Sequence, residues 1–246
     1  MIALAEHRRA RLAHYGSWPV VLGTLVAALF VSNVFAAPLI AVVAGAAGGG
    51  IGTFTELVTK PWVLFLSIVA GDGALFLAVY VLLVRRGVLS WREMGLTGGV
   101  GTRSLVRGMG WAAVFVAASG AVSFLLAALG VQQNQAQQFP LQGMGPAGRI
   151  GIWIAGVIVA PVTEEIFFRG YVFRAMAERK GTVRGVIYSS ALFSLLHLNR
   201  AAFLPLAVGG SILAVSYRRT GDLWTPIIAH ALNNAFSFSI LLAGGS

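Results

Sequence analysis

Long apolar segments restrict the folds open to this chain more than any other feature of its sequence. A helix needs about 20 apolar residues to cross the roughly 30 Å hydrocarbon core of a bilayer. Candidate segments lie at 18–44, 61–84, 109–130, 150–173, 183–198, 201–217 and 222–244. Because backbone polar groups in lipid must be hydrogen-bonded internally, we predict an all-α, polytopic transmembrane bundle of about seven helices.

The composition agrees with a membrane protein and excludes several kinds of chemistry. Of the 246 residues, 57% are hydrophobic and 11% are charged, whereas soluble domains carry about a quarter charged residues. The chain has no cysteine, which excludes disulfides, thiolate metal ligands and a cysteine nucleophile. The net charge of +10 would suit nucleic acid, but the position of the basic residues along the chain argues against a nucleic-acid partner.

Basic residues gather on one side of the expected bundle when the N-terminus lies in the cytoplasm. Membrane proteins concentrate Lys and Arg in cytoplasmic loops. The cytoplasmic side then holds 14 of the 18 basic residues, namely Arg8, Arg9, Arg11, Arg85, Arg86, Arg92, Arg103, Arg107, Arg174, Arg179, Lys180, Arg184, Arg218 and Arg219. Lys60, Arg149 and Arg200 fall outside, and Arg169 lies within a span. We therefore predict an N-in, C-out topology.

The segments between the spans indicate a single integral membrane domain over residues 1–246. The first span follows a basic stretch from His7 to Arg11, but its apolar run is far longer than the 7–15 residues or so of a signal peptide, so we interpret it as a retained anchor. The connection from Arg85 to Gly108 contains no sign of a soluble domain. Gly45 to Gly52 is interpreted as a flexible or re-entrant junction, and Val131 to Gly145 as a Gln-rich outside loop.

Several polar residues interrupt the apolar segments, and each needs a reason to be there. A charge near the bilayer centre costs about 2.5–3.5 kcal/mol even on the lenient insertion scale. The residues concerned are Asp72, Glu164, Glu165, Arg169, His197 and His230, with Asn233 and Asn234 beside them. Such residues mark functional sites in membrane proteins.

The two adjacent acids have different expected roles. Glu165 and Arg169 are spaced i, i+4 with the acid first, which favours a structural ion pair along a helix. Glu164 lies about 100° further round the helix and lacks that partner, so it is the acid left to act on a water. Pro161, one turn earlier, removes a backbone hydrogen bond and can open the helix there.

Two histidines complete the set. Phe193 and His197 share one face of a helix, and so do His230 and Asn234. A lone histidine of this kind is more often a packing residue. The second pair can direct two hydrogen-bond donors at one point, or combine a ligand nitrogen with an orienting amide.

These ordered motifs resemble the CPBP intramembrane proteases, which include the CAAX prenyl endopeptidases and the bacterial Abi proteins. The resemblance rests on an EExxxR signature at Glu164, Glu165 and Arg169, on FxxxH at Phe193 and His197, and on HxxxN at His230 and Asn234. It covers residues 147–240, and nothing in it extends to Asp72. It implies hydrolysis of a peptide bond inside the membrane.

The resemblance also implies roles for the site residues. Glu164 would be the general base and His197 would assist it, while His230 and Asn234 would stabilise the oxyanion or bind a metal. Glu165 joins this catalytic set chiefly through its ion pair with Arg169. Glu164, His197 and His230 would supply three ligands and an open position for one divalent ion, most plausibly zinc, but the same groups can activate water without a metal.

We expect Glu164, His197, His230 and Asn234 to line a single cavity between the fourth, fifth and seventh helices. Counted from the cytoplasmic helix ends, Glu164 and His230 lie about 15 Å and 13 Å deep. The cavity would therefore open toward the cytoplasm. The expected partners are a membrane-associated peptide or protein substrate and the lipid bilayer, and the expected location is a bacterial cytoplasmic membrane. Whether the substrate is prenylated stays open.

Other functions are weighed against this interpretation. Intramembrane acids and histidines also build proton-coupled transporters, and a non-proteolytic scaffold or immunity protein is a second alternative. Gly209, Gly210 and Ser211 are followed by Ile212 rather than by the glycine of a rhomboid-type serine site, and we interpret these glycines as close helix packing. Asp72 lacks the second aspartate of an aspartyl dyad, and we interpret it as a polar contact or an ion-pair partner. No His-Glu-x-x-His zinc motif occurs.

Overall fold

The computed structural model describes residues 2–46, 61–131 and 145–244, and within these ranges the chain is a bundle of helices without strands. Most of the expected junction at Gly45 to Gly52 and of the Gln-rich loop lies outside the described residues. The elements are α1 Ile2–Tyr15, α2 Trp18–Ala46, α4 Pro61–Val79, η1 Tyr80–Val84, α5 Thr102–Ala128, α6 Pro146–Ile154, η3 Ala155–Val159, α7 Ala160–Glu165, η4 Ile166–Phe173, α8 Arg174–Lys180, α9 Thr182–Leu196, α10 Phe203–Thr220 and α11 Trp224–Gly244. The η elements are π-helical turns.

The expected all-α membrane bundle is confirmed. Four helices are long and apolar enough to cross a bilayer by length and composition, at Trp18–Val42, Phe65–Val84, Thr102–Ala128 and Pro146–Lys180. Two expected boundaries were wrong. The third helix begins at Thr102 rather than at 109, and the fourth runs on from Pro146 to Lys180.

The fourth helix stays continuous because its backbone pairing changes around Pro161. That proline lies between two π-helical segments, η3 and η4. A π turn bonds residues five apart, so the backbone accommodates the missing N–H of proline without a break. The helix is therefore altered at the position where the sequence predicts an opening, but it does not end there.

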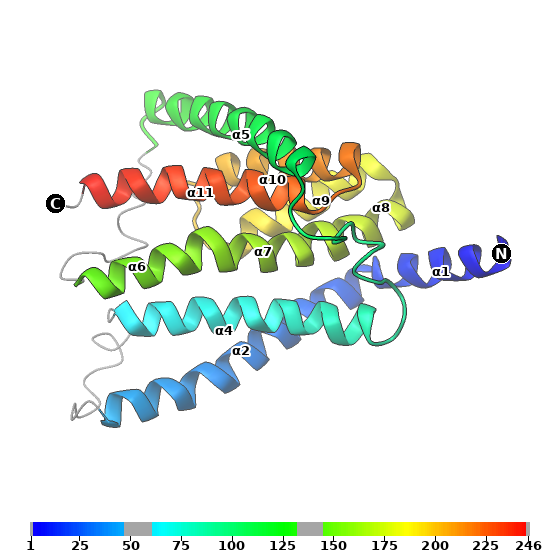
Figure 1. Cartoon of the computed structure of the whole chain (residues 1–246), viewed down its shortest axis with the longest axis horizontal. Helices are drawn as coiled ribbons and strands as arrows, with labels where there is room; N and C mark the ends of the chain where they lie inside the picture. Colours follow the sequence, from blue (N-terminus) through cyan, green and yellow to red (C-terminus); the bar gives the residue numbers. More distant parts are fainter. Residues whose placement is uncertain (1, 47–60, 132–144, 245–246) are drawn as a thin grey trace.

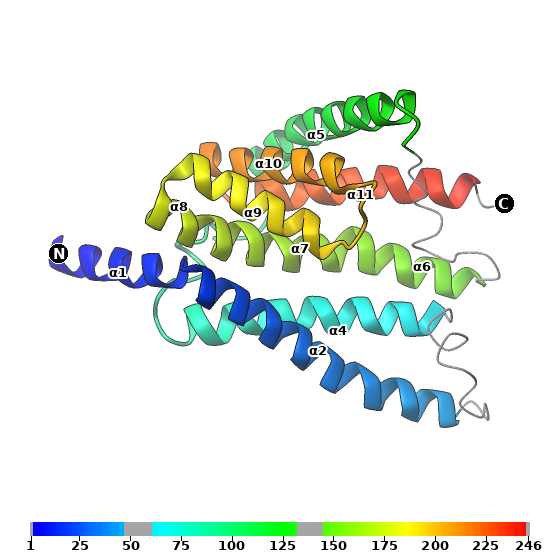
Figure 2. The same ribbon diagram turned by 180° about the vertical axis from the view of Figure 1, so that it is seen from behind.

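Successive passes run in alternating directions, and the two ends of the chain lie at opposite ends of the bundle (Figures 1 and 2). The junctions after α4, after α8 and after α10 lie at the end where α1 lies. The arginine-rich stretches lie in α1, in the connection after α4 and in the last turns of α8 and α10, which end at these junctions. The arrangement suits termini on opposite sides of a membrane, while the orientation itself stays a prediction.

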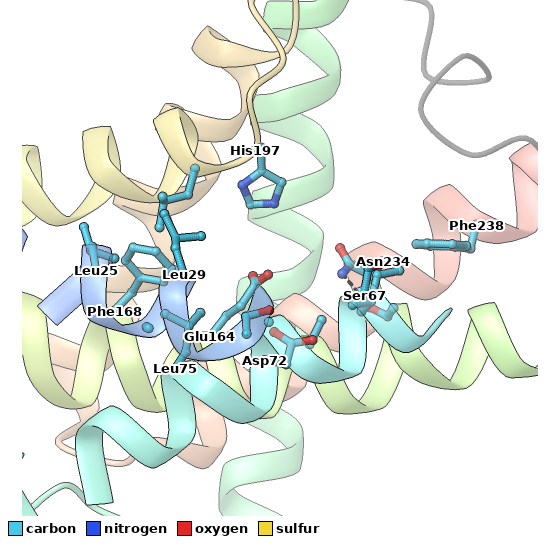
Figure 3. A pocket seen from close by; sticks show the side chains of 17 residues that line it. Leu25, Leu29, Ser67, Asp72, Leu75, Glu164, Phe168, His197, Asn234 and Phe238 are labelled. Carbon is cyan, nitrogen blue, oxygen red and sulfur yellow. Dashed lines mark hydrogen bonds between the residues drawn. The ribbon is translucent and has the colours of Figure 1, made fainter. Parts of the chain in front are cut away.

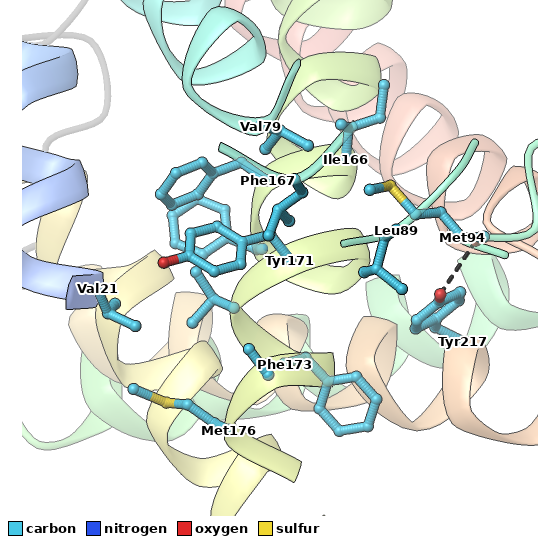
Figure 4. Packing of buried hydrophobic residues seen from close by; sticks show 14 of the residues in the cluster. Val21, Val79, Leu89, Met94, Ile166, Phe167, Tyr171, Phe173, Met176 and Tyr217 are labelled. Atoms are coloured by element: carbon cyan, nitrogen blue, oxygen red, sulfur yellow. Dashed lines mark hydrogen bonds between the residues drawn. The ribbon is translucent and has the colours of Figure 1, made fainter. Parts of the chain in front are cut away.

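The helix that carries the acid pair runs through the middle of the bundle. Every residue of η4 is buried, as expected for a helix that is apolar all round. Phe167, Tyr171 and Phe173 pack in the main hydrophobic cluster shown in Figure 4. Tyr217 of α10 donates a hydrogen bond to the carbonyl of Met94 at 3.0 Å, which attaches the turn after α4 to the same core.

Glycines bring the helices around this centre into close contact, as the sequence indicates for Gly209 and Gly210. A Cβ atom on Gly209 of α10 would lie 2.2 Å from the ring of Phe115 on α5. One on Gly210 would lie 3.2 Å from Ser190 on α9. Any side chain at these positions would push α10 away from its neighbours.

Candidate active site

The ion pair expected between Glu165 and Arg169 is present at the centre of the bundle. Arg169 Nη1 lies 2.5 Å from Glu165 Oε1, and both side chains are completely buried. Arg169 Nη2 also donates to the carbonyl of Gly210 at 3.0 Å, and its guanidinium lies 4.8 Å from the ring centre of Phe193. The pair therefore joins three helices, because these partners lie on α7–η4, α9 and α10.

Glu165 makes a second contact that its helical spacing does not indicate. Its Oε1 lies 3.0 Å from Nδ1 of His230 on α11. Because the ion-paired carboxylate accepts the hydrogen bond, Nδ1 carries the proton. The other ring nitrogen, Nε2, faces Glu164, with 3.9 Å between Nε2 and Oε2. Glu165 thus orients the histidine as well as neutralising Arg169.

Glu164 lines a cavity, in contrast to Glu165. Its side chain is 17% exposed and borders a cavity of about 320 Å³ that also has His197 and Asn234 in its wall. In Figure 3 the imidazole of His197 and the carboxylate of Glu164 point toward one another. The expected difference between the two acids, one paired and one open to a cavity, matches this geometry.

His197 lies at the end of α9 and is held in one orientation. Its Nδ1 lies 2.8 Å from the carbonyl oxygen of Phe193. Since a carbonyl can only accept, Nδ1 carries the proton and Nε2 is left with its lone pair. Leu198, the next residue, has a φ of 51°, an unusual backbone conformation for a non-glycine residue. The chain thus turns sharply directly after the histidine.

Phe193 packs against both histidines. Its ring centre lies 4.7 Å from that of His197 and 5.7 Å from that of His230. The phenylalanine of the FxxxH motif therefore contacts both imidazoles and the guanidinium of Arg169.

Asn234 is anchored to the helix of the acid pair. Its Nδ2 donates to the carbonyl of Gly156 at 2.8 Å, within the π turn η3. The side-chain oxygen Oδ1 of Asn234 accepts a hydrogen bond from Nδ2 of Asn233 at 3.4 Å. One N–H of the Asn234 amide is used in this way, and the second is left for another acceptor.

Three of the four expected residues, Glu164, His197 and Asn234, line one cavity, but much of its wall comes from α2 and α4 rather than from the fourth, fifth and seventh helices alone. His230 instead lines an adjoining cavity of about 290 Å³, which shares His197, Asn234 and Phe238 with the first. Its Nδ1 is bonded to Glu165, while its Nε2 stays within 3.9 Å of Glu164 Oε2. The site consists of two cavities that meet at His197 and Asn234.

Asp72 of α4 is a site residue that the motifs missed. It lines the same cavity as Glu164, is only 6% exposed, and its Oδ2 has no hydrogen-bond partner among the described residues. No ion pair of Asp72 occurs among residues 2–46, 61–131 and 145–244, so the ion-pair alternative has no support there. The available signal was a charge in an apolar span, between Gly71 and Gly73.

The expected metal ligands do not form a ready metal site. Among residues 2–46, 61–131 and 145–244, no three His, Asp or Glu side chains are grouped closely enough to hold an ion. His230 uses Nδ1 for Glu165, which leaves Nε2 as the nitrogen that could bind an ion. A zinc ion held by Glu164, His197 and His230 stays a prediction of the sequence, and the mechanism below does not depend on it.

Comparison with known proteins agrees with the motif assignment. Residues 146–236 match the family described as type II CAAX prenyl endopeptidase Rce1-like. The similarity to this family thus extends over 91 of the 246 residues. It contains the acid pair, Arg169, both histidines and Asn234.

Two relatives are similar to parts of this chain. The chain is 35% identical over 83 residues to "Putative membrane peptidase YdiL" of Bacillus subtilis (strain 168), which covers 34% of each protein. It is 29% identical over 130 residues to "CAAX prenyl protease 2" of Arabidopsis thaliana, covering 44% of this chain and 42% of the relative. The matches thus span less than half of either relative. No solved structure is significantly similar.

Proposed function

We propose that this protein is an intramembrane endopeptidase in which Glu164 activates the water that attacks a peptide bond. The observation that carries the proposal is the contrast between the two acids. Glu165 is buried against Arg169 and His230, while Glu164 borders a cavity together with His197. A carboxylate with access to water beside an imidazole is suited to general-base catalysis.

In the proposed reaction, Glu164 accepts a proton from a water in the cavity while the water oxygen bonds to the carbonyl carbon of the substrate. The Nε2 lone pair of His197 can accept the second hydrogen of that water and so align it. Negative charge then develops on the carbonyl oxygen, and donors aimed at that point lower the barrier. The second N–H of Asn234 is such a donor. When the tetrahedral intermediate collapses, the C–N bond breaks and Glu164 gives the proton that it accepted to the leaving amine nitrogen.

His230 has a positioning role in this scheme. Its Nδ1 proton is held by Glu165, so in the neutral ring Nε2, which lies 3.9 Å from Glu164 Oε2, carries a lone pair and cannot donate to that carboxylate. Protonation of Nε2 would add a second donor to the site. The ion pair of Glu165 with Arg169 keeps this imidazole in place.

The proposed substrate is a peptide that is itself associated with the membrane. Much of the cavity wall beside Glu164 is apolar and comes from α2 and α4, through Leu25, Ala28, Leu29 and Leu75. Such a wall fits an apolar chain better than a soluble peptide. The name of the Arabidopsis relative suggests a CAAX-type peptide as the first substrate to test, and we propose a bacterial cytoplasmic membrane with cleavage on its cytoplasmic side.

The test is cleavage of quenched-fluorescence peptides by the purified protein in liposomes. The probes are a peptide ending in a farnesylated CAAX sequence, its unprenylated form and a hydrophobic membrane-spanning peptide. Glu164→Gln should fold normally and lose at least a hundredfold in turnover, since general-base catalysis contributes about 10²–10⁴-fold. Glu178→Gln, which changes an acid paired with Arg9 on the surface, is the matched control and should cleave normally.

Two results would contradict the proposal. One is cleavage by Glu164→Gln at the wild-type rate, and the other is the absence of any product that depends on Glu164 from all three probes. A scaffold would keep its cellular phenotype in this variant. No contact among the described residues favours a scaffold or a transporter.

A further inference from the structure

Near the site, the buried acidic side chains outnumber the buried arginine, and Asp72 is the acid that has no basic partner among the described residues. Asp72 and Glu165 are both buried, and Asp72 and Glu164 line the same cavity as His197. Within the described ranges, Arg169 is the fully buried basic side chain, and it is paired with Glu165. Asp72 therefore has no protein cation assigned to it.

Asp72 presents, in the wall of a cavity, a buried carboxylate oxygen without a hydrogen-bond partner within the ranges that the structure describes. Its Oδ2 is enclosed and without a hydrogen-bond partner in the described part of the chain, although nearly all buried polar atoms in proteins are hydrogen-bonded. The side chain lies in the wall of the cavity that contains Glu164, and Figure 3 shows the two side chains next to each other. An unfilled acceptor thus lies beside the proposed base.

A peptide drawn into this cavity brings the complementary groups. Each backbone N–H that leaves water for an apolar cavity needs an acceptor, or it costs free energy. Besides Asp72, the polar side chains in the wall are Ser32, Ser67, Glu164, His197 and Asn234. Of these, Glu164 and His197 are assigned to the water and Asn234 to the oxyanion. Asp72 is the strongest acceptor that remains, because bonds to a carboxylate exceed those to a hydroxyl.

We propose that Asp72 is a substrate-positioning residue whose Oδ2 accepts a hydrogen bond from a backbone N–H of the peptide, next to the bond that Glu164 cleaves. This inference rests on the proposed protease function. Neighbouring N–H groups of an extended peptide are about 3.3 Å apart, so a fixed acceptor beside the base selects one register. Asp72 would in this way decide which peptide bond reaches the water.

The test is a scan of N-methylated peptides against variants of Asp72. The probe is whichever peptide the wild-type protein cleaves, remade with one N-methyl group at each amide within two residues of the cleavage point. In the wild type, one position should lower kcat/KM by about tenfold to a hundredfold more than its neighbours, the range for a hydrogen bond to a charged group. The Asp72→Leu variant has no acceptor at residue 72. In this variant, N-methylation at that amide should lower kcat/KM no more than N-methylation at the neighbouring amides.

Two further variants make the result specific. Asp72→Asn keeps a carbonyl acceptor in a similar shape and should retain part of the sensitivity at the same position. Ile68→Val alters the wall of the same cavity one turn away on α4 and should leave the N-methyl pattern unchanged. If Asp72→Leu does not fold, Asp72→Asn can still be compared with the wild type. N-methylation at the selected amide should then lower kcat/KM less in Asp72→Asn than in the wild type.

The inference is overturned if Asp72→Leu lowers cleavage of every peptide by the same factor, because the role of Asp72 is then structural. It is also overturned if the cleavage depends on a basic side chain of the substrate instead of a backbone N–H. A wild-type protein that cleaves none of the probes contradicts the proposed function itself, which is a different outcome.

Discussion

Replacing Glu165 with glutamine tests whether the buried ion pair stabilises the centre of the bundle. The substitution keeps the size of the side chain and one carbonyl acceptor, but it removes the negative charge beside Arg169. Both side chains are completely buried, so no water can replace the lost partner. Arg169 would keep the carbonyl of Gly210 at 3.0 Å and the ring of Phe193 at 4.8 Å.

The expected cost follows from these remaining contacts. Breaking a buried ion pair by removing one partner costs about 3–5 kcal/mol. The side-chain carbonyl of the new glutamine and the Phe193 ring still contact the guanidinium. We therefore expect the free energy of unfolding to fall by an amount at the lower end of this range, about 3 kcal/mol. For a chain of this size each kcal/mol lowers the melting temperature by about 2–4 °C, so Glu165→Gln should melt about 6–12 °C lower.

Thermal unfolding of the purified protein, followed by size-exclusion chromatography, measures this shift. The double variant Glu165→Gln with Arg169→Met also removes the unpaired charge, so it should melt higher than Glu165→Gln alone. An unchanged melting temperature in the single variant would refute the reasoning. So would a double variant no more stable than the single one, since the loss could not then come from the unpaired guanidinium.

Three further predictions follow from the packing, the charge distribution and the histidines. Gly209→Ala should lose about 1–3 kcal/mol of stability by overpacking, because the alanine Cβ would lie 2.2 Å from the Phe115 ring. The control is Gly110→Ala on α5, where the new Cβ would have no neighbour within 4 Å among the described residues. It should be neutral or slightly stabilising in the same melting assay. Reporters fused in the Gln132 to Gln142 segment should be active only on the outer side, and a cytoplasmic signal there would contradict the N-in, C-out topology. Elemental analysis of the purified protein should find about one zinc per chain, reduced in His230→Ala, if the sequence-based metal assignment holds; equal zinc in both proteins would remove His230 from the ligand set.

The sequence alone predicts the parts of this protein that depend on local spacing. The apolar segments predict a helical membrane bundle, because the bilayer requires about 20 residues for each crossing. About seven crossings were expected, and four of the described helices are long and apolar enough to span. The spacing of Glu165 and Arg169 predicts their ion pair, because residues four apart share a helix face. The same rule groups Phe193 with His197 and His230 with Asn234. It also separates Glu164 from Glu165, and Glu164 does border a cavity while Glu165 is buried.

Only the tertiary structure decides which residues meet across helices. His230 bonds to Glu165 from 65 residues away, Asn234 bonds to the carbonyl of Gly156, and Asp72 reaches the cavity from α4. These contacts depend on how far each helix is rotated and how closely it approaches its neighbours, which is set by features such as Gly209 against Phe115. Helical periodicity states which residues share a face, but the packing of the helices determines what that face meets.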